Sequence, residues 1–325
     1  MHLKRTCIIR CKHVLYHLSI ISLATTGIRC SHDTTMLFHA GVGQRSALTD
    51  IQAAFRKKHP EVKVNFSFKG SGYFIADISR SREGDLYMPG EEFYLLQAAE
   101  RGFIKEYDPD RDIAAHFITV IITPRGNPKG ITKIEDFAKP GVRVGLGNPR
   151  ACAIGIEHER VFKRAGIWEE VQRNAAFSAK CIPELGNAAQ HDLIDAAIVW
   201  ATNAVLYLRD CEIIPLEPRY RAAIRLPVAV TSFSKNPREA ETLKNFILSD
   251  TGQTIFLSHA YAAGSIGRNE EGYLAEGDTS TDPLMRWLVN AAAIVKDSSR
   301  AATPEEVGPL MGEVLRQRKT IRAGN

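Results

Sequence analysis

The sequence predicts an α/β protein built as two lobes, and three observations lead to that prediction. The chain has 325 residues, which exceeds one domain of typical size and suits two. Strand-like and helix-like segments alternate in its first hundred residues, an order that gives a largely parallel sheet. Glycine-containing turns at residues 41–44 and 69–72 separate predicted strands from the helices that follow them.

The first lobe begins with an apolar run, residues 36–40, that predicts a strand. Ser46 then opens a helix that ends before Pro60. Its apolar face has helical spacing and consists of Leu48, Ile51 and Phe55. Residues 62–68 alternate between apolar and polar side chains, which predicts a half-buried strand. Further helices are expected over residues 74–78 and 91–101.

The second lobe and the return of the chain show the same kinds of pattern. Short apolar or β-branched runs predict strands at residues 117–123, 142–146, 196–199, 211–215 and 226–231. Apolar positions at helical spacing predict helices at residues 134–137, 154–165 and 240–248. The sequence contains no internal repeat.

The first thirty residues differ from the rest of the chain. A basic start, an apolar run from Val14 to Ala24 and a few small residues follow one another, which is the order of a secretory signal. The run is too short to span a bilayer. We therefore expect residues 1–30 to be an export signal, the alternative being a disordered basic N-terminus.

The charge of the chain is concentrated in that segment. The five basic residues within positions 1–30 equal the formal net charge of +5, so the remaining chain is formally neutral. A neutral chain gives no electrostatic case for binding nucleic acid. The basic residues of the segment are Lys4, Arg5, Arg10, Lys12 and Arg29.

The cysteines leave two questions open. Cys30 is a candidate lipid acceptor after signal cleavage, although Arg29 is not the small residue that such signals carry before the cysteine. Cys152, Cys181 and Cys211 are an odd number, so at most two of them pair with each other. Cys181 and Cys211 can form a disulfide in an oxidising compartment, and three buried free thiols are the alternative.

The C-terminal part is expected to be an extension of the two lobes. Residues 267–281 are polar and rich in Gly, Glu and Thr, which is typical of a linker. An amphipathic helix is predicted from Leu284 to Val295, and a second one starts at Thr303-Pro304-Glu305-Glu306 with a Thr cap and Pro in the first turn.

Five segments taken together resemble the periplasmic molybdate/tungstate-binding proteins of ABC importers. They are "LFHAGVGQRSALTDIQAAFRKKHPEVKV", "GDLYMPGEEFYLLQAAERGFI", "ITPRGNPKGITKIEDFAKPGVRVGLGNPRACAIG", "DAAIVWATNA" and "FSKNPREAETLKNFILSDTGQTIFLSHAY". They occur in the family's order and span roughly residues 36–261, so the C-terminal extension lies outside the resemblance.

The resemblance implies the type II periplasmic-binding-protein fold, in which two α/β lobes are joined by two crossover segments and hold the ligand between them. The crossovers are then expected near residues 113–124 and 218–230. Lobe I is expected over residues 33–115 and 225–265, lobe II over 116–224, and the extension over 267–325. The resemblance also implies an extracytoplasmic, non-enzymatic monomer that carries a small oxyanion to an ABC transporter permease, without a cofactor or a metal centre.

A small dianion needs hydrogen-bond donors and no nearby carboxylate. Helix N-termini supply free backbone N–H groups and a partial positive charge, and glycines allow the backbone to approach closely. A site made of neutral donors accepts a fully ionised oxyanion and rejects a protonated one, whose O–H requires an acceptor. We predict ligand binding by Val42, Gly43, Gly70, Ser71, Cys152, Ile154, Ile182 and Trp200.

Several of these positions depart from the resembling family. Val42 and Gly43 stand where that family has an anion-binding serine, and Trp200 replaces its cleft tyrosine. Ser71 matches the serine of the second loop, while Ile154 and Ile182 match backbone donors. Cys152 falls near the carboxylate of the tungstate-type relatives, so six-fold coordination through acids is not expected. Gln44 and Arg45 are further residues that could reach the first loop.

Each site residue also has a simpler interpretation. Ser71 can be an ordinary turn or cap residue, Val42 and Gly43 a tight turn, and Trp200 a buried core residue. Cys152 at a helix start can be a nucleophile or a metal ligand, but a small packing residue is the favoured interpretation. No second His or Asp is spaced for a triad with His158.

Three functions are compatible with the sequence. The favoured one is an importer receptor for molybdate, tungstate or a similar oxyanion. The second is a receptor of the same fold for another solute, such as a small organic acid or a metal chelate. The third is a sensor or scaffold that presents the C-terminal helices to a partner. The sequence has no Walker-type phosphate loop, HExxH, GxSxG or, after residue 30, CxxC motif, so an enzyme is not expected.

Overall fold

The computed structural model describes residues 34–263, 266–275, 278, 280–282, 284–286 and 288–289. The predicted export signal, the candidate lipid acceptor Cys30 and the second tail helix lie outside the described residues. Within the described part, no helix is both long enough and apolar enough to cross a membrane.

The first sheet is largely parallel, as the strand–helix alternation predicts. β1 (Thr34–Gly41) pairs in parallel with β2 (Val62–Lys69) on one side and β3 (Leu86–Met88) on the other. The short strand β10 (Ala229–Val230) adds to β3 in the antiparallel sense. The helices of this half are α1 (Arg45–Lys58), α2 (Ser71–Ser81), α3 (Glu92–Glu100), α8 (Pro237–Leu248) and α9 (Asp250–Ser258).

The second sheet is mixed and has the order β6-β5-β7-β4-β8, with β9 pairing β4. Its strands are β4 (Ile113–Pro124), β5 (Val144–Gly147), β6 (Ala175–Ala179), β7 (Ala196–Trp200), β8 (Cys211–Pro215) and β9 (Ala223–Pro227). Its α-helices are α4 (Ala153–Arg164), α5 (Trp168–Arg173), α6 (Ile182–Gln190) and α7 (Ala201–Ala204). Single 3-10 turns occupy Val42–Gln44, Ile134–Ala138, Val205–Tyr207 and Pro218–Tyr220.

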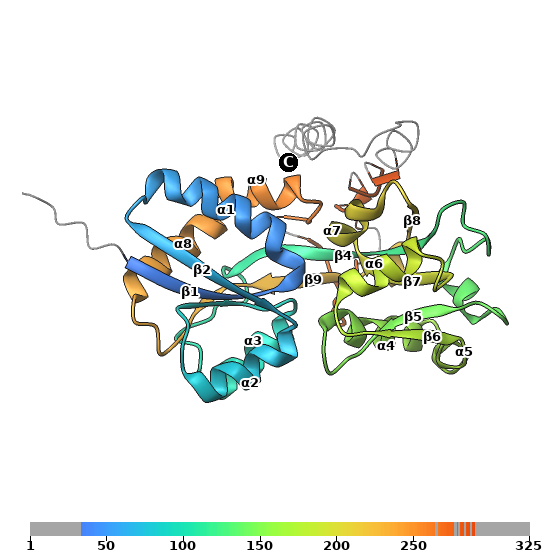
Figure 1. Ribbon diagram of the computed structural model, residues 1–325, viewed down its shortest axis with the longest axis horizontal. Helices are drawn as coiled ribbons and strands as arrows, with labels where there is room; N and C mark the ends of the chain where they lie inside the picture. The colour runs from blue at the N-terminus through green and yellow to red at the C-terminus, as the bar shows by residue number, and fades with distance from the viewer. Residues whose placement is uncertain are drawn as a thin grey trace, which may run out of the picture. The chain divides into compact units, whose positions relative to one another are not determined.

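Two antiparallel strands connect the two halves. The first part of β4, residues 113–118, pairs with β9, and the second part pairs with β7 and β8. Figure 1 shows β4 and β9 running between the sheet that contains β1 and β2 and the sheet that contains β5 to β7. We call the halves lobe I and lobe II.

One predicted strand is two strands in the structure, and the structure contains elements that were not predicted from the sequence. Residues 226–231, expected as one strand, belong to β9 and β10, and Val228 between them donates its N–H to the Asp112 carbonyl. The helices α5 and α6 and the strand β6 were not predicted. Most residues of β6 are exposed or half-buried, so it lacks the apolar alternation that marks a strand.

The described part of the C-terminal extension packs against the crossover strands. Tyr273 forms a β-bridge with Ala222, and its neighbour Arg221 donates to Thr281 and Asp282. The described residues 282, 284–286 and 288–289 are helical, with Leu284, Met285 and Leu288 buried in the main core.

Candidate functional site

A small cavity lies where loops of both lobes meet, and we call it the interlobe cavity. Its volume is about 40 Å³. Since a single water molecule needs roughly 10–15 Å³ measured in this way, the cavity suits a ligand of only a few atoms. It is lined by Gly41, Val42, Gly43, Gln44, Lys69, Gly70, Ser71, Gly90, Phe117, Cys152, Ala153, Cys181, Ile182 and Trp200.

Four helical segments begin at this cavity. The 3-10 turn that leads into α1 follows Gly41, and α2, α4 and α6 follow Gly70, Cys152 and Cys181. None of these four N-cap residues accepts a hydrogen bond through its side chain from the first turn. The first N–H groups of a helix have no partner within it, so these helix starts present donors and positive partial charge to the cavity.

The Ser71 hydroxyl is oriented by a neighbouring loop. Its Oγ accepts a hydrogen bond from the backbone N–H of Gly90 at 2.9 Å, and the side chain is 3% exposed. Because that oxygen serves as the acceptor for Gly90, its own proton is available to a ligand. Ser71 is therefore a neutral donor held by the contact between the start of α2 and the loop that follows β3.

The two lobes touch beside the cavity. A Cβ atom added to Gly70 would lie 2.3 Å from the Ala151 carbonyl oxygen, and one added to Gly72 would lie 2.8 Å from the Arg150 carbonyl oxygen. Tyr94 of α3 donates to the Pro149 carbonyl at 3.4 Å. Gly70 has an extended backbone that any residue adopts, so the close approach of the other lobe is what requires a glycine here.

Aromatic rings form one wall of the cavity. Phe117 of β4 stacks on Trp200 with ring centroids 5.0 Å apart, and on Tyr261 at 5.2 Å. The Tyr261 hydroxyl donates to the Gly43 carbonyl at 2.8 Å. This stack buries Trp200 to 1% exposure and anchors the first loop of lobe I to the crossover strand.

Among the described residues, no carboxylate or histidine lines the interlobe cavity. Lys69 is its one fully charged lining residue, and its ammonium pairs with Asp77 of α2. Gln44 does not offer its amide to a ligand, because its Oε1 accepts from Gly41 N–H and its Nε2 donates to the Pro89 carbonyl. Arg45 turns away and covers the Phe68 ring.

Two thiols also lie at the cavity. Burial raises the pKa of Cys152 to about 11 and also raises the pKa of Cys181. The Cys152 Sγ lies 3.7 Å from the Asn148 carbonyl oxygen and 3.8 Å from that of Ala179. None of the described cysteines is in a disulfide, so Cys181 and Cys211 are not bonded to each other.

His158 of α4 holds the lobe II sheet behind these loops. Its Nδ1 accepts from the Gly147 N–H at 2.9 Å, which leaves Nε2 to donate to the Ile198 carbonyl at 2.7 Å. Burial lowers its pKa to about 4. The ring is therefore neutral near pH 7 and ties β5 to β7 as a structural residue.

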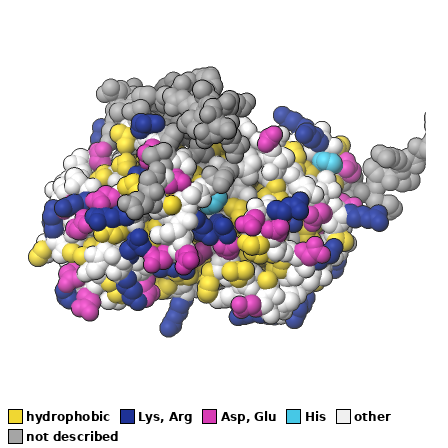
Figure 2. All heavy atoms as spheres, turned by 180° about the vertical axis from the view of Figure 1, so that it is seen from behind, with side chains coloured by type: hydrophobic (Ala, Val, Ile, Leu, Met, Phe, Trp, Pro, Cys, Tyr) yellow, Lys and Arg dark blue, Asp and Glu magenta, His cyan; other side chains and the backbone are white. Residues whose placement is uncertain are grey.

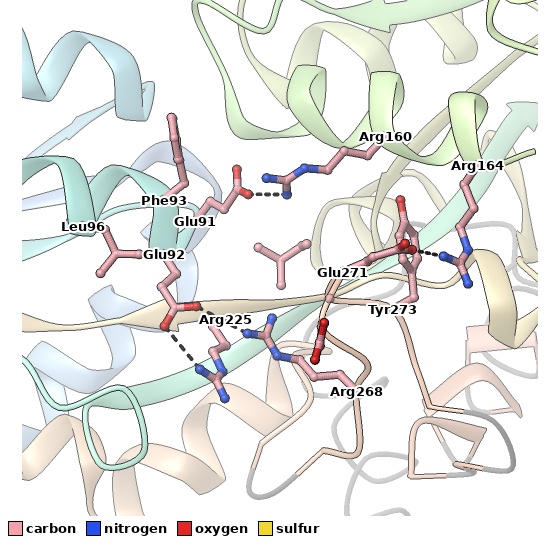
Figure 3. Close-up of a pocket in the computed structure, with 13 residues that line it drawn as sticks. Glu91, Glu92, Phe93, Leu96, Arg160, Arg164, Arg225, Arg268, Glu271 and Tyr273 are labelled. Atoms are coloured by element: carbon pink, nitrogen blue, oxygen red, sulfur yellow. Dashed lines mark hydrogen bonds and ion pairs between the residues drawn. The ribbon is translucent and has the colours of Figure 1, made fainter.

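A second, larger hollow between the lobes has the opposite chemistry, and we call it the charged groove. It encloses about 590 Å³ and includes residues of α3, α4, β9 and the described tail. Figure 3 shows its side chains facing one another as ion pairs. The pairs are Arg160 with Glu91 at 2.7 Å, Arg225 with Glu92 at 3.3 Å, Arg268 with Glu92 at 3.4 Å, and Arg164 with Glu271.

Acidic and basic side chains alternate in this groove, and burial shifts the pKa values of some of them. Burial raises the pKa of Glu91 although Arg160 opposes the shift, and burial lowers the pKa of Arg268. Burial also raises the pKa of Glu157, behind the groove, to about 8. Figure 2, a view of the opposite face from Figure 1, likewise shows acidic and basic side chains interspersed across the surface. The described residues that line the groove include four arginines and four glutamates, so neither sign is in excess there to attract an anion.

The predicted binding residues can now be placed. Seven of them line the interlobe cavity, namely Val42, Gly43, Gly70, Ser71, Cys152, Ile182 and Trp200. Ile154 does not, because its side chain is fully buried in the core one residue behind Ala153. Sequence reasoning missed Gly90, Phe117, Ala153 and Cys181 as lining residues. Cys181 had a usable signal, since Cys181-Ile182-Pro183-Glu184 has the proline and early acid of a helix start.

The described residues contain no group of three or more His, Cys, Asp or Glu side chains arranged to hold a metal ion. In that part of the chain, the polar groups that line the interlobe cavity are backbone groups, the Ser71 hydroxyl, the Cys152 and Cys181 thiols, the Trp200 indole, and the internally paired side chains of Lys69 and Gln44.

Comparison with known proteins places this arrangement in a family. A model of the bacterial extracellular solute-binding proteins matches residues 37–262. The chain belongs to this family. A Haemophilus influenzae protein named as a binding protein is 23% identical to this solute-binding protein over 226 residues, which cover 70% of this chain and 90% of the relative.

Two solved structures illustrate the shared fold. The periplasmic molybdate-binding protein of Azotobacter vinelandii has a TM-score of 0.61 at 14% identity, with 71% of this chain and all of that chain covered. The sulfate-binding protein of Mycobacterium tuberculosis has a TM-score of 0.62 at 16% identity, with 70% and 86% covered. These similarities confirm the predicted fold class, the type II periplasmic-binding-protein fold, and the C-terminal tail lies beyond the family match.

Proposed function

We propose that this solute-binding protein is the receptor of an ABC importer for a small, fully ionised oxyanion such as molybdate or tungstate, and that it binds without catalysis. The observation that carries the proposal is the convergence of the starts of α2, α4 and α6 and of the turn Val42–Gln44 on a cavity that has no carboxylate among its described lining residues. Such helix starts stabilise an anion through oriented N–H groups and the helix dipole.

In this proposal the ligand contacts both lobes. Val42, Gly43, Gly70 and Ser71 act from lobe I, while Cys152, Ile182 and Trp200 act from lobe II, with Ile154 contributing its backbone N–H. The cavity is small, which favours a compact tetrahedral ion over an extended organic acid. Because the lobes touch at Gly70 and Ala151, closure excludes water and strengthens each hydrogen bond to the anion.

Isothermal titration of the purified protein with molybdate, tungstate, sulfate and phosphate tests the proposal. We expect a saturable 1:1 isotherm with at least one fully ionised anion and weaker binding of phosphate, which carries a proton near pH 7. Absence of heat from all four anions, with a folded protein, would rule out the oxyanion assignment.

Ser71→Ala sharpens this test. Loss of one hydrogen bond to a charged ligand costs about 1.5–3 kcal/mol, so the affinity should fall roughly ten- to hundredfold. The matched control is Ser79→Ala on the same helix, because its hydroxyl is exposed and donates to the Ile75 carbonyl. Equal affinities for the two variants would remove Ser71 from the site.

A further inference from the structure

The interlobe cavity carries a feature that oxyanion binding does not require, which is a pair of thiols. Cys152 and Cys181 are the N-cap residues of α4 and α6, and both line the cavity. Neither thiol is in a disulfide. The two helix starts belong to the same lobe, so the pair does not depend on lobe closure.

The local backbone places the two thiols on neighbouring loops of lobe II. β5 and β6 are adjacent parallel strands in which Gly147 is opposite Ala179. The loops after these strands carry Cys152 and Cys181, and the Cys152 Sγ contacts the carbonyl of Ala179, two residues before Cys181. Each thiol also contributes to the electrostatic surroundings of the pocket, since the neighbouring Cys181 raises the pKa of Cys152 further beyond the effect of burial.

We propose that Cys152 and Cys181 form a dithiol subsite that binds a thiophilic oxyacid of trivalent arsenic within the interlobe cavity. This inference shares its pocket with the proposed function but needs only lobe II. Soft thiol ligands select soft centres, and the absence of carboxylate and imidazole from the lining leaves sulfur as the side-chain ligand available there.

The binding step is a balanced exchange of ligands on arsenic. Arsenious acid, As(OH)₃, enters as a neutral molecule, two As–O bonds break and two As–S bonds form. Each thiol proton leaves with a hydroxide as water, so two waters are released and arsenic stays trivalent. Thiols that retain their protons near neutral pH supply those protons without a base.

The test uses the full chain with Cys7, Cys11 and Cys30 replaced by serine, which leaves Cys152, Cys181 and Cys211. Reduced, desalted protein is incubated with sodium arsenite, and bound arsenic is measured by native mass spectrometry alongside titration of free thiols. We expect one arsenic per chain and the loss of two free thiols.

Single substitutions identify the ligands. Cys152→Ser and Cys181→Ser should each weaken arsenite binding at least hundredfold, because each leaves a single thiol. Cys211→Ser is the matched control, since Cys211 is buried in β8 and does not line the cavity. It should bind as the parent does. A fully reduced parent that takes up no arsenic, or single variants that bind unchanged, would overturn the dithiol site.

A second measurement covers the case in which a variant fails to fold. In the unsubstituted cavity, arsenite should protect the partly exposed Cys181 from alkylation by iodoacetamide, as mapped by peptide mass spectrometry. Unchanged alkylation also contradicts the inference. Tetrahedral oxyanion titrations on the same samples separate the two proposals: anion binding without arsenite uptake refutes only this one, and the reverse refutes only the proposed function.

Discussion

The interlobe cavity and the charged groove lie between the same two lobes and are built on opposite principles. The cavity is lined by helix starts and neutral groups, and its one fully charged residue pairs outside it with Asp77. The groove is lined by arginines and glutamates whose charges pair with one another, and the pair of Arg160 with Glu91 joins α4 to the start of α3. Backbone dipoles are fixed by the fold, whereas long charged side chains adjust to one another.

Because of this difference, the two regions should respond to different kinds of substitution. In the cavity, the proposed binding of an anion depends on the position of the backbone. A single added methyl group or a displaced strand should therefore lower the anion affinity. In the groove, the paired side chains range from largely buried, as Glu91 and Glu92 are, to exposed, as Glu271 is, and the exposed pairs gain little in water and are screened by salt.

The largest change in the free energy of unfolding is expected at His158, which joins β5 to β7 behind the loops of the interlobe cavity. Its folded-state pKa of about 4 lies below the ordinary value of 6.5, so the unfolded chain binds the proton first as the pH falls. Stability is therefore complete above about pH 7 and is lost between pH 6.5 and 4, by about 3 kcal/mol from this group. Urea unfolding at pH 7 and pH 4.5 measures the change.

His158→Gln is the control for that titration, because glutamine cannot take up a proton in this range. The difference in unfolding free energy between parent and variant should change with pH in step with the histidine. Parallel curves for the two proteins over pH 4.5–7 would show that His158 does not bind its proton as the buried geometry requires.

The next effect is expected at Arg221, which joins the crossover to the described tail. Its guanidinium donates twice to the Leu216 carbonyl, at 2.9 and 3.2 Å, and to Thr281 and Asp282 at 3.0 Å each. Arg221→Met should reduce the unfolding free energy by about 2 kcal/mol, because buried acceptors lose their partner. Asp282→Asn, at a partly exposed side chain, should cost less than about 1 kcal/mol. Equal costs would indicate that the ion pair, not the buried carbonyl contacts, holds the tail.

The contrast also explains which parts of the molecule could be predicted from sequence. The strand–turn–helix order, with alternation over residues 62–68 and the turn at 69–72, predicts β2, α2 and the Ser71 donor because these are local patterns. The sequence did not show that the Ile154 side chain is buried, since side-chain burial at a helix start depends on which face packs against the sheet, and its role as a backbone donor stays a prediction. The strand β6 was missed because its side chains are mostly exposed and carry no alternation.

The charged groove could not be predicted from sequence at all. Its ion pairs join residues far apart in the chain, such as Glu92 with Arg225 and Arg268, and no local pattern links them. The same holds for Phe117 and Gly90, which reach the cavity only through tertiary packing. The sequence therefore predicts donors that lie at the start of a single helix. It does not predict contacts that require two segments far apart in the chain.

At Gly70 we expect a substitution to change the stability little and to lower the anion affinity. In Gly70→Ala, the new Cβ would lie 2.3 Å from the Ala151 carbonyl oxygen of the other lobe, so the lobes must separate for the methyl group to fit. We expect anion affinity to fall at least tenfold, or about 1.4 kcal/mol, while the melting temperature of the unliganded protein changes little. Gly72→Ala, with its contact at 2.8 Å, should show a smaller loss. If Gly70→Ala binds anion as the parent does, the closed contact is not part of the bound state.

The smallest effect is expected at Glu271, whose side chain is 64% exposed in its pair with Arg164. Glu271→Gln should lower the unfolding free energy by no more than about 0.5 kcal/mol, because water screens the pair and ordering two long side chains offsets its attraction. The difference should disappear in 1 M salt, where the screening length is about 3 Å. A loss above about 1.5 kcal/mol, or one that persists in 1 M salt, would mean that the groove binds the lobes through desolvated charge. In that case the groove would be as sensitive to single changes as the cavity, and the contrast between the two regions would fail.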